Sequence, residues 1–161
     1  MTKIVWAPGN LIVATNEGVD VRFAGVEITA AAPGHVGLAP GERVIRVDLA
    51  GVTSSVTIDL DRRHLQEMEA WAEDRKLRGA ENTGRPPAMP GETVLSAVRA
   101  IVTDSRDTEY RQVAGRVAGA GSGWDASWMF SPEPPAGVKH LTVEFTLNGE
   151  LTGNSIRVQL D

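Results

Sequence analysis

Alternation of apolar and polar residues near the end of the chain constrains the fold more than any other feature of the sequence. Residues 141–147 read LTVEFTL and residues 156–160 read IRVQL, so every second side chain is apolar. In a β-strand this period gathers the apolar side chains on one face of a sheet. Asn148 and Gly149 directly follow the first run, and this pair favours the tight turn of a hairpin. The sequence therefore predicts a C-terminal β-hairpin.

Two further alternating runs lie in the first half of the chain. Residues 43–49 read RVIRVDL and residues 54–60 read SSVTIDL, again with an apolar residue at every second position. A short connection around Gly51 joins the two runs. This arrangement predicts two strands that form a second hairpin.

The apolar residues of segment 19–30 change phase partway along. Val19, Val21 and Phe23 occupy one phase, whereas the apolar residues from 26 to 30 occupy the other. A shift of one residue would turn every later side chain to the wrong face of the sheet. We therefore expect a β-bulge or a tight bend at Ala24 and Gly25.

The second half of the chain supplies the remaining predicted strands. Residues 93–103 (TVLSAVRAIVT) fit either a strand or a helix, and their β-branched content favours a strand buried on both faces. Residues 110–117 and 124–130 read as the next two strands. The total of about nine strands predicts an antiparallel β-sandwich, with an open sheet covered by the helix as the alternative.

One segment, at about 61–78, has the pattern of an amphipathic helix inserted among these strands. It lacks Gly, Pro and β-branched residues, and Leu65, Met68, Trp71 and Ala72 form one apolar stripe. Asp59 or Asp61 could cap its start, and Gly79 is a natural stop. We expect this helix to pack on the sandwich or to cap one of its ends.

Length and composition describe one globular domain and exclude some chemistries. The 161 residues fit a single domain, 1–161, with a core of its own. With no cysteine, disulfides and thiolate chemistry are excluded, and a net charge of −5 disfavours nucleic-acid binding. The chain contains no apolar run of signal-peptide or membrane-span length, so no membrane partner is expected and the default location is cytoplasmic.

Segments 98–115 and 124–145 resemble a group of uncharacterised bacterial proteins of similar size. The shared pattern is a strand ending in Asp, a Thr-x-Tyr, an aromatic strand, a Pro-Pro turn and a Leu-x-Val strand. The matching positions are Asp104, Thr108, Tyr110, Phe130, Pro132, Pro134, Pro135, Leu141 and Val143. The group often has Gly before the Thr, where this chain has Asp107.

The resemblance implies an immunoglobulin-like or related β-sandwich. It implies no activity, because none is attached to the group, and therefore no catalytic residue.

Three carboxylates around one turn are weak candidates for a metal site. Asp104, Asp107 and Glu109 lie close together in the sequence, and Ca²⁺ takes roughly six to eight oxygen ligands. However, the spacing is not that of an EF-hand, and an Asx-turn at Asp104 is the favoured interpretation. The histidines His35 and His64 stand far apart, and neither has a metal-ligand spacing with His140. We therefore expect no metal and no cofactor.

No arrangement of residues indicates catalysis. The chain has no G-x-S-x-G motif, and the glycine-rich segment 119–123 is not followed by the Lys-Ser/Thr of a phosphate-binding loop. A hairpin loop is the simpler interpretation of that segment. We therefore do not expect an enzyme.

Two tryptophans give the only direct suggestion of a binding site. Trp124 and Trp128 share one face of a predicted strand with Phe130, and exposed indoles could stack on a sugar or grip a peptide. Burial in the sandwich core is the competing and favoured interpretation.

The sequence thus predicts a non-catalytic interaction or structural module, as a subunit or accessory part of a larger assembly. Its expected partner is another protein or a second copy of the chain. The alternative is a small-ligand or carbohydrate-binding module with Trp124, Trp128 and Phe130 as its platform.

Overall fold

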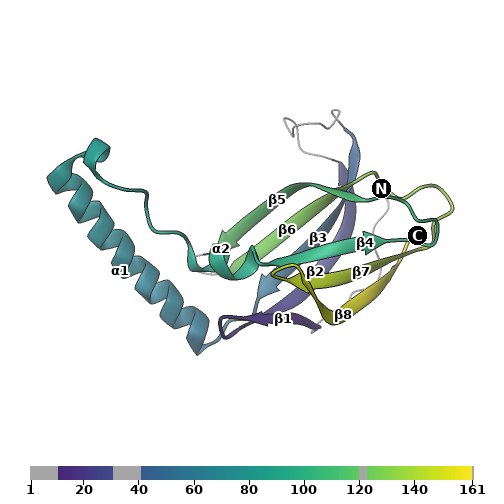
Figure 1. Ribbon diagram of the computed structural model, residues 1–161, viewed down its shortest axis with the longest axis horizontal. Helices are drawn as coiled ribbons and strands as arrows, with labels where there is room; N and C mark the ends of the chain where they lie inside the picture. The colour runs from purple at the N-terminus through teal and green to yellow at the C-terminus, as the bar shows by residue number, and fades with distance from the viewer. Residues whose placement is uncertain (1–10, 31–40, 120–122, 161) are drawn as a thin grey trace.

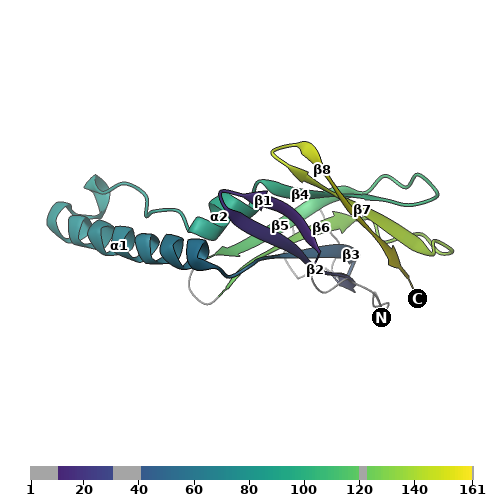
Figure 2. The ribbon, with the colours of Figure 1, turned by 90° about the horizontal axis from the view of Figure 1, so that it is seen from below.

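A computed structural model describes residues 11–30, 41–119 and 123–160. Within these ranges the chain forms eight strands, and all neighbouring strands pair antiparallel in two sheets. The two sheets face each other across a common core (Figures 1 and 2). The predicted mainly-β sandwich with an inserted helix is therefore confirmed, with eight strands in the described ranges rather than about nine.

The larger sheet has five strands in the order β1-β2-β3-β6-β5. Their bounds are β1 Ile12–Asn16, β2 Val19–Ala30, β3 Arg43–Gly51, β5 Arg111–Gly119 and β6 Trp124–Ser131. The predicted phase change in β2 is confirmed, because the register with β3 shifts between Phe23 and Gly25. Gly25 has a φ of 143°, which L side chains rarely adopt, so glycine fits this bulge.

The smaller sheet has three strands in the order β4-β7-β8. These are β4 Val98–Thr103, β7 His140–Leu147 and β8 Glu150–Gln159. The predicted C-terminal hairpin joins β7 to β8, and Asn148 and Gly149 both have positive φ, at 52° and 84°. Two successive positive φ values are the signature of the type I′ turn that the Asn-Gly pair favours.

The core lies between the two sheets and is made by the predicted apolar faces. Phe23 of β2 and Phe145 of β7 meet edge to face, with ring centroids 6.1 Å apart. Leu49 of β3 and Val143 of β7 are fully buried in the same cluster. Burial of these alternating side chains supplies the main force that holds the sheets together.

The helix α1 spans Ser55–Arg78 and begins earlier than the sequence predicts. Residues 54–60 are therefore not a strand, and the predicted hairpin around Gly51 is wrong. The backbone N–H of Ser54 donates to Thr57 Oγ1 at 2.9 Å, and the N–H of Thr57 donates to Ser54 Oγ at 3.4 Å. This reciprocal capping fixes the helix start at Ser54, and not at Asp59 or Asp61 as expected.

Only the first turns of the helix contact the sandwich, through Leu60 at the edge of the core and Asp61, which accepts the Trp124 indole N–H. The helix extends away from one end of the molecule, and the chain returns through η1 Ala80–Asn82 and an irregular segment (Figure 1). Thr57 is its single buried residue. The predicted packing of the apolar stripe is wrong, because the return segment lies along α1 where a sheet was expected.

The ambiguous segment 93–103 contains both of the structures considered for it. The short helix α2 covers Pro90–Leu95, and β4 begins at Val98. Val98, Ala100 and Val102 are buried, whereas the residues between them are exposed. The strand is thus buried on one face only, and not on both as predicted.

Candidate functional site

The aromatic residues of β6 lie in the core. Trp124, Trp128 and Phe130 are 4%, 3% and 3% exposed. The indole N–H of Trp124 donates to Asp61 Oδ1 at 3.0 Å, and that of Trp128 donates to the Val98 carbonyl at 2.9 Å. These residues therefore do not form the exposed platform considered from the sequence, because each ring is covered and each indole N–H has an internal partner.

Close neighbours cover the ring of Trp128. The guanidinium carbon of Arg99 lies 4.4 Å from the ring centroid. Gly115 of β5 lies against the ring so closely that a Cβ there would come within 2.6 Å of it. This buried indole is therefore not available to stack on a sugar or a peptide.

The acidic turn after β4 is organised around Asp104. Asp104 Oδ1 accepts the backbone N–H groups of Arg106 at 2.8 Å and Thr108 at 3.1 Å. Its other oxygen accepts the Tyr110 hydroxyl at 2.6 Å. This is the Asx-turn arrangement favoured from the sequence, and Asp107 and Glu109 stay exposed to solvent.

These contacts shift the acidity of both partners. Partial burial alone would raise the pKa of Asp104, but hydrogen bonds from Thr108, Tyr110 and Arg106 outweigh it and lower the pKa to about 2. Burial raises the pKa of Tyr110 above its usual value, and the hydrogen bond and charge of Asp104 raise it further. The carboxylate is thus held ionised as a structural acceptor.

A metal site is not found in the part of the chain that the structure describes. No group of three or more His, Asp or Glu side chains gathers there in a way that could hold an ion. His64 lies near the base of α1 and His140 begins β7, whereas His35 lies outside the described residues. Asp104, Asp107 and Glu109 share a turn without forming a ligand cage.

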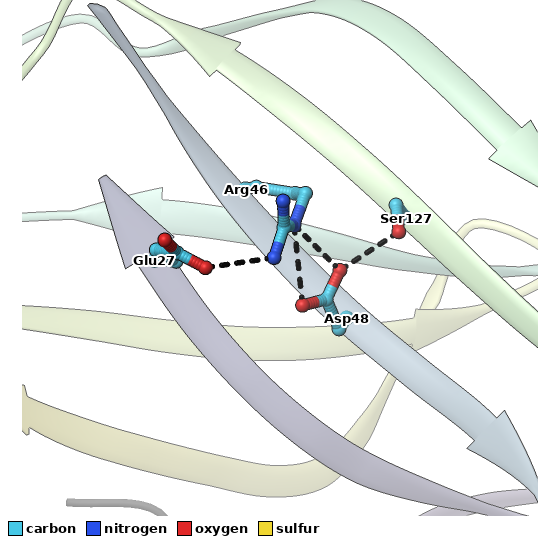
Figure 3. Close-up of polar contacts among 4 residues, drawn as sticks. All are labelled: Glu27, Arg46, Asp48 and Ser127. Carbon is cyan, nitrogen blue, oxygen red and sulfur yellow. Dashed lines mark hydrogen bonds and ion pairs between the residues drawn. The ribbon is translucent and has the colours of Figure 1, made fainter. Parts of the chain in front are cut away.

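A polar network connects side chains of neighbouring strands on the outward face of the larger sheet (Figure 3). Arg46 of β3 donates to Glu27 Oε2 on β2 at 2.8 Å and to Asp48 Oδ1 at 3.1 Å. Ser127 Oγ on β6 donates to the same Asp48 oxygen at 2.7 Å. The residues directly opposite each other are Glu27 with Arg46, and Asp48 with Ser127. The network therefore has the geometry of cross-strand pairs that stabilise the register of three strands.

Two surface depressions of the described residues differ in their lining. One lies between β1 and β8 and is lined largely by Ile12, Val13, Leu147 and Leu151, with Glu150 as its one acidic residue. Another, of about 540 Å³, places the hydroxyls of Ser105 and Thr142 and the cations Lys139 and Arg157 around His140, beside Asp104, whose oxygens are already bonded within the turn. Within the described residues, no hydrogen bond joins the hydroxyl of Ser105 or Thr142 to His140, so the pairing of a nucleophile with its base is not formed there.

We use the name arm for α1 together with its return segment, residues 55–89. Most of the arm does not pack against the rest of the chain. At about 1.5 Å per residue, the 24 residues of α1 extend roughly 36 Å. The helix points out from the sandwich in both views (Figures 1 and 2).

Internal contacts hold the arm in shape. The indole N–H of Trp71 donates to the Gly84 carbonyl at 2.9 Å, and Arg75 lies 5.5 Å from the Trp71 ring centroid. Arg78 pairs with Asp74 at 3.0 Å near the end of the helix. The Trp71–Gly84 hydrogen bond ties the return segment to one side of α1, and most other residues of the helix are exposed.

Apolar side chains stand on the solvent side of α1. Ile58 is 50% exposed, Leu65 is 63% exposed and Leu77 is 84% exposed. Met68 and Trp71, from the stripe predicted in the sequence, are half-buried, whereas Leu65 and Ala72 are exposed. Ile58 and Leu65 lie two helical turns apart on one face of α1, and apolar side chains gathered on one exposed face mark contact sites for other proteins.

Part of this exposed face of α1 is predicted from the sequence, but as a face that packs on the core. Leu65 and Ala72 belong to the predicted stripe, which we expected to face the core. Ile58 falls in a segment predicted as a strand, and neither Arg62 nor Glu69 is predicted from the sequence to take part in binding. Arg62 lies three residues before Leu65 and Glu69 lies four residues after it. This spacing places the three side chains on one face of a helix and was the signal that could have revealed them.

No protein-family model matches this chain, and neither a curated protein nor a solved structure matches it. In the described part of the chain, no helix combines the length and apolar character needed to cross a lipid bilayer.

Proposed function

We propose that this protein is a non-catalytic interaction module and that the arm is its contact element for another protein. The observation that carries the proposal is the exposure of α1, a 24-residue helix with Thr57 as its one buried residue. In proteins, most helical stability comes from packing an apolar face. A partner on α1 would supply the burial that the sandwich does not.

The sandwich would then act as the rigid base of this contact element. We propose that it is immunoglobulin-like, and its strand order supports this. The order β2-β3-β6-β5 beside β4-β7-β8 corresponds to the A-B-E-D and C-F-G sheets of constant-type immunoglobulin domains. On this correspondence β1 is an added edge strand, and the arm occupies the connection between strands B and C.

The small-ligand alternative lacks a supporting observation. It required an exposed indole in a groove, and both Trp124 and Trp128 are buried. A partner protein needs no such platform, because exposed apolar side chains such as Leu65 can provide its anchoring contacts.

Photo-crosslinking in the cells that produce the protein tests this proposal. A photoreactive residue at position 65 is expected to give a discrete protein adduct. The matched control is position 151, since Leu151 is 61% exposed against 63% for Leu65 but lies on β8. The proposal fails if position 65 yields no adduct, or yields the same diffuse products as position 151.

A further inference from the structure

The solvent side of α1 carries a stripe of exposed residues with regular spacing. It consists of Ile58, Arg62, Leu65, Glu69 and Ala72, at steps of four, three, four and three residues. Residues spaced in this way lie on one face of a helix. All five side chains are exposed, so this outer stripe contacts neither the sandwich nor the return segment extensively.

The outer stripe is symmetric about its central residue. Ile58 and Ala72 each stand seven residues from Leu65, on opposite sides. If a second copy of α1 lies antiparallel with a two-fold axis at Leu65, Ile58 faces Ala72 of the other copy and Leu65 faces its own counterpart. Apolar side chains then meet apolar side chains at all three levels of the contact.

The charges of the outer stripe are complementary in the same alignment. With the axis at Leu65, Arg62 of one copy lies within one residue's rise, about 1.5 Å along the axis, of Glu69 of the other. The two-fold symmetry makes this contact twice. A parallel pair would instead place Arg62 on Arg62 and Glu69 on Glu69, which is repulsive.

Both charges are available for such a contact. Arg62 pairs with Asp59 at 3.5 Å, but both side chains are about two-thirds exposed, and such pairs contribute little. Glu69 has no ion pair within the described part of the chain. Contact with a second copy would satisfy Glu69 and give Arg62 a better-shielded partner.

We infer that the partner of α1 is α1 of a second copy of this chain, packed antiparallel about a two-fold axis at Leu65. This inference rests on the proposed function. Three apolar levels make a small contact, so the dimer is expected to be weak and to form with rising concentration. The return segment stays on the far side of each helix, where Trp71 holds it to Gly84.

Disulfide trapping tests both the pairing and its direction, and the chain has no cysteine of its own to interfere. Oxidation of purified Leu65→Cys is expected to give a covalent dimer. Ile58→Cys and Ala72→Cys are each expected to stay monomeric alone and to link to each other when mixed. Leu77→Cys, exposed on the same helix but off the outer stripe, is the matched control.

The outcomes separate this inference from the proposed function. If Leu65→Cys links no faster than Leu77→Cys, the second-copy inference is overturned, even where photo-crosslinking at position 65 still captures a different protein. Efficient linking of Ile58→Cys and Ala72→Cys each to itself overturns the antiparallel direction. Because these side chains are exposed, the variants should keep the circular-dichroism spectrum of the wild type.

A charge exchange provides a second test without cysteines. Arg62→Glu and Glu69→Arg are each expected to weaken the dimer by roughly tenfold in sedimentation equilibrium, since each places like charges together twice. A mixture of the two variants, and the double variant Arg62→Glu/Glu69→Arg, should both restore it. Failure of the mixture to associate overturns the alignment.

Discussion

The carboxylate of Asp104 illustrates how one side chain can define a turn. Its two oxygens accept two backbone N–H groups and the Tyr110 hydroxyl, so three donors from five successive residues depend on it. The turn connects β4 of one sheet to β5 of the other. Asp104 therefore helps to set the path by which the chain crosses between the sheets.

Replacing this carboxylate should destabilise the fold in a pH-dependent way. We expect Asp104→Asn to lower the free energy of unfolding at pH 7 by about 1 kcal/mol, because a charged acceptor of three hydrogen bonds becomes neutral. The folded pKa is lowered, so the stabilisation is present above about pH 4 and is lost as pH falls from the ordinary value of 3.8 toward about 2. Urea unfolding at pH 7, 4 and 2 measures this.

The matched control for this substitution is Asp107→Asn. Asp107 is exposed in the same turn and has a φ of 55°, which asparagine tolerates. Its unfolding free energy should equal that of the wild type at all three pH values. A difference between wild type and Asp104→Asn that persists unchanged at pH 2 would refute the ionic origin of the effect.

A second residue-scale prediction concerns the contact between α2 and the end of β5. A Cβ on Gly91 would lie 2.4 Å from the Gly119 Cα and 3.0 Å from Trp124. Gly91→Ala should therefore destabilise the protein by about 1–3 kcal/mol, although alanine favours a helix. Gly84→Ala, with nothing within 4 Å of the added Cβ, should leave the thermal midpoint unchanged. Equal midpoints for both variants would contradict this packing.

At the scale of elements, α1 should unfold more readily than the sheets. Its start depends on the Ser54 cap, and little of its surface is buried. Ser54→Ala should cost the helix about 1 kcal/mol, whereas Ser55→Ala removes no capping contact. Hydrogen exchange is expected to quicken across α1 in Ser54→Ala and to stay unchanged in β3 and β7. Equal acceleration in the sheets would show that helix and sandwich unfold together.

Local pattern was sufficient to predict most strands but not where the first helix begins. The bulge at Gly25 and the hairpin at Asn148 follow from neighbouring residues alone, and both are confirmed. Segment 54–60 alternates like a strand, but the preceding β3 already pairs with β2 and β6 on its two edges. Since β6 is formed about seventy residues later, the local pattern could not reveal that β3 had no free edge.

The same limit applies to the candidate site. Alternation along β6 shows that Trp124 and Trp128 share a face, but not that this face is covered. Arg99 and Gly115, which enclose the Trp128 ring, come from two other strands. The exposure of Leu65 likewise depends on the absence of any element across from it. Burial of a given face is decided by the whole assembly and not by the segment.

At the scale of the whole molecule, limited proteolysis should cut the arm before it cuts the sandwich. We expect the earliest tryptic cuts within the described residues at Arg75, Lys76 or Arg78, near the end of the helix, and not at Arg46 or Arg99 in the sheets. Mass spectrometry identifies the cut sites.

The nicked protein should remain one particle. The N-terminal piece contains β1, β2 and β3, the C-terminal piece contains β4 to β8, and β3 pairs with β6 across the two pieces. We expect the two pieces to elute together in size-exclusion chromatography and to keep a cooperative thermal transition. If the two pieces separate, the core between the sheets depends on an intact arm, contrary to this prediction.

The arm leaves the sandwich at Ser55 and rejoins it at α2, and the two helices contact each other there. Its two ends thus meet at the same end of the molecule, so its length is not dictated by the distance between the strands that it connects. Insertions and deletions of whole helical turns could lengthen or shorten it while every core contact is kept. Evolution could therefore change the length of the arm and the residues of the outer stripe without changing the residues that fold the sandwich.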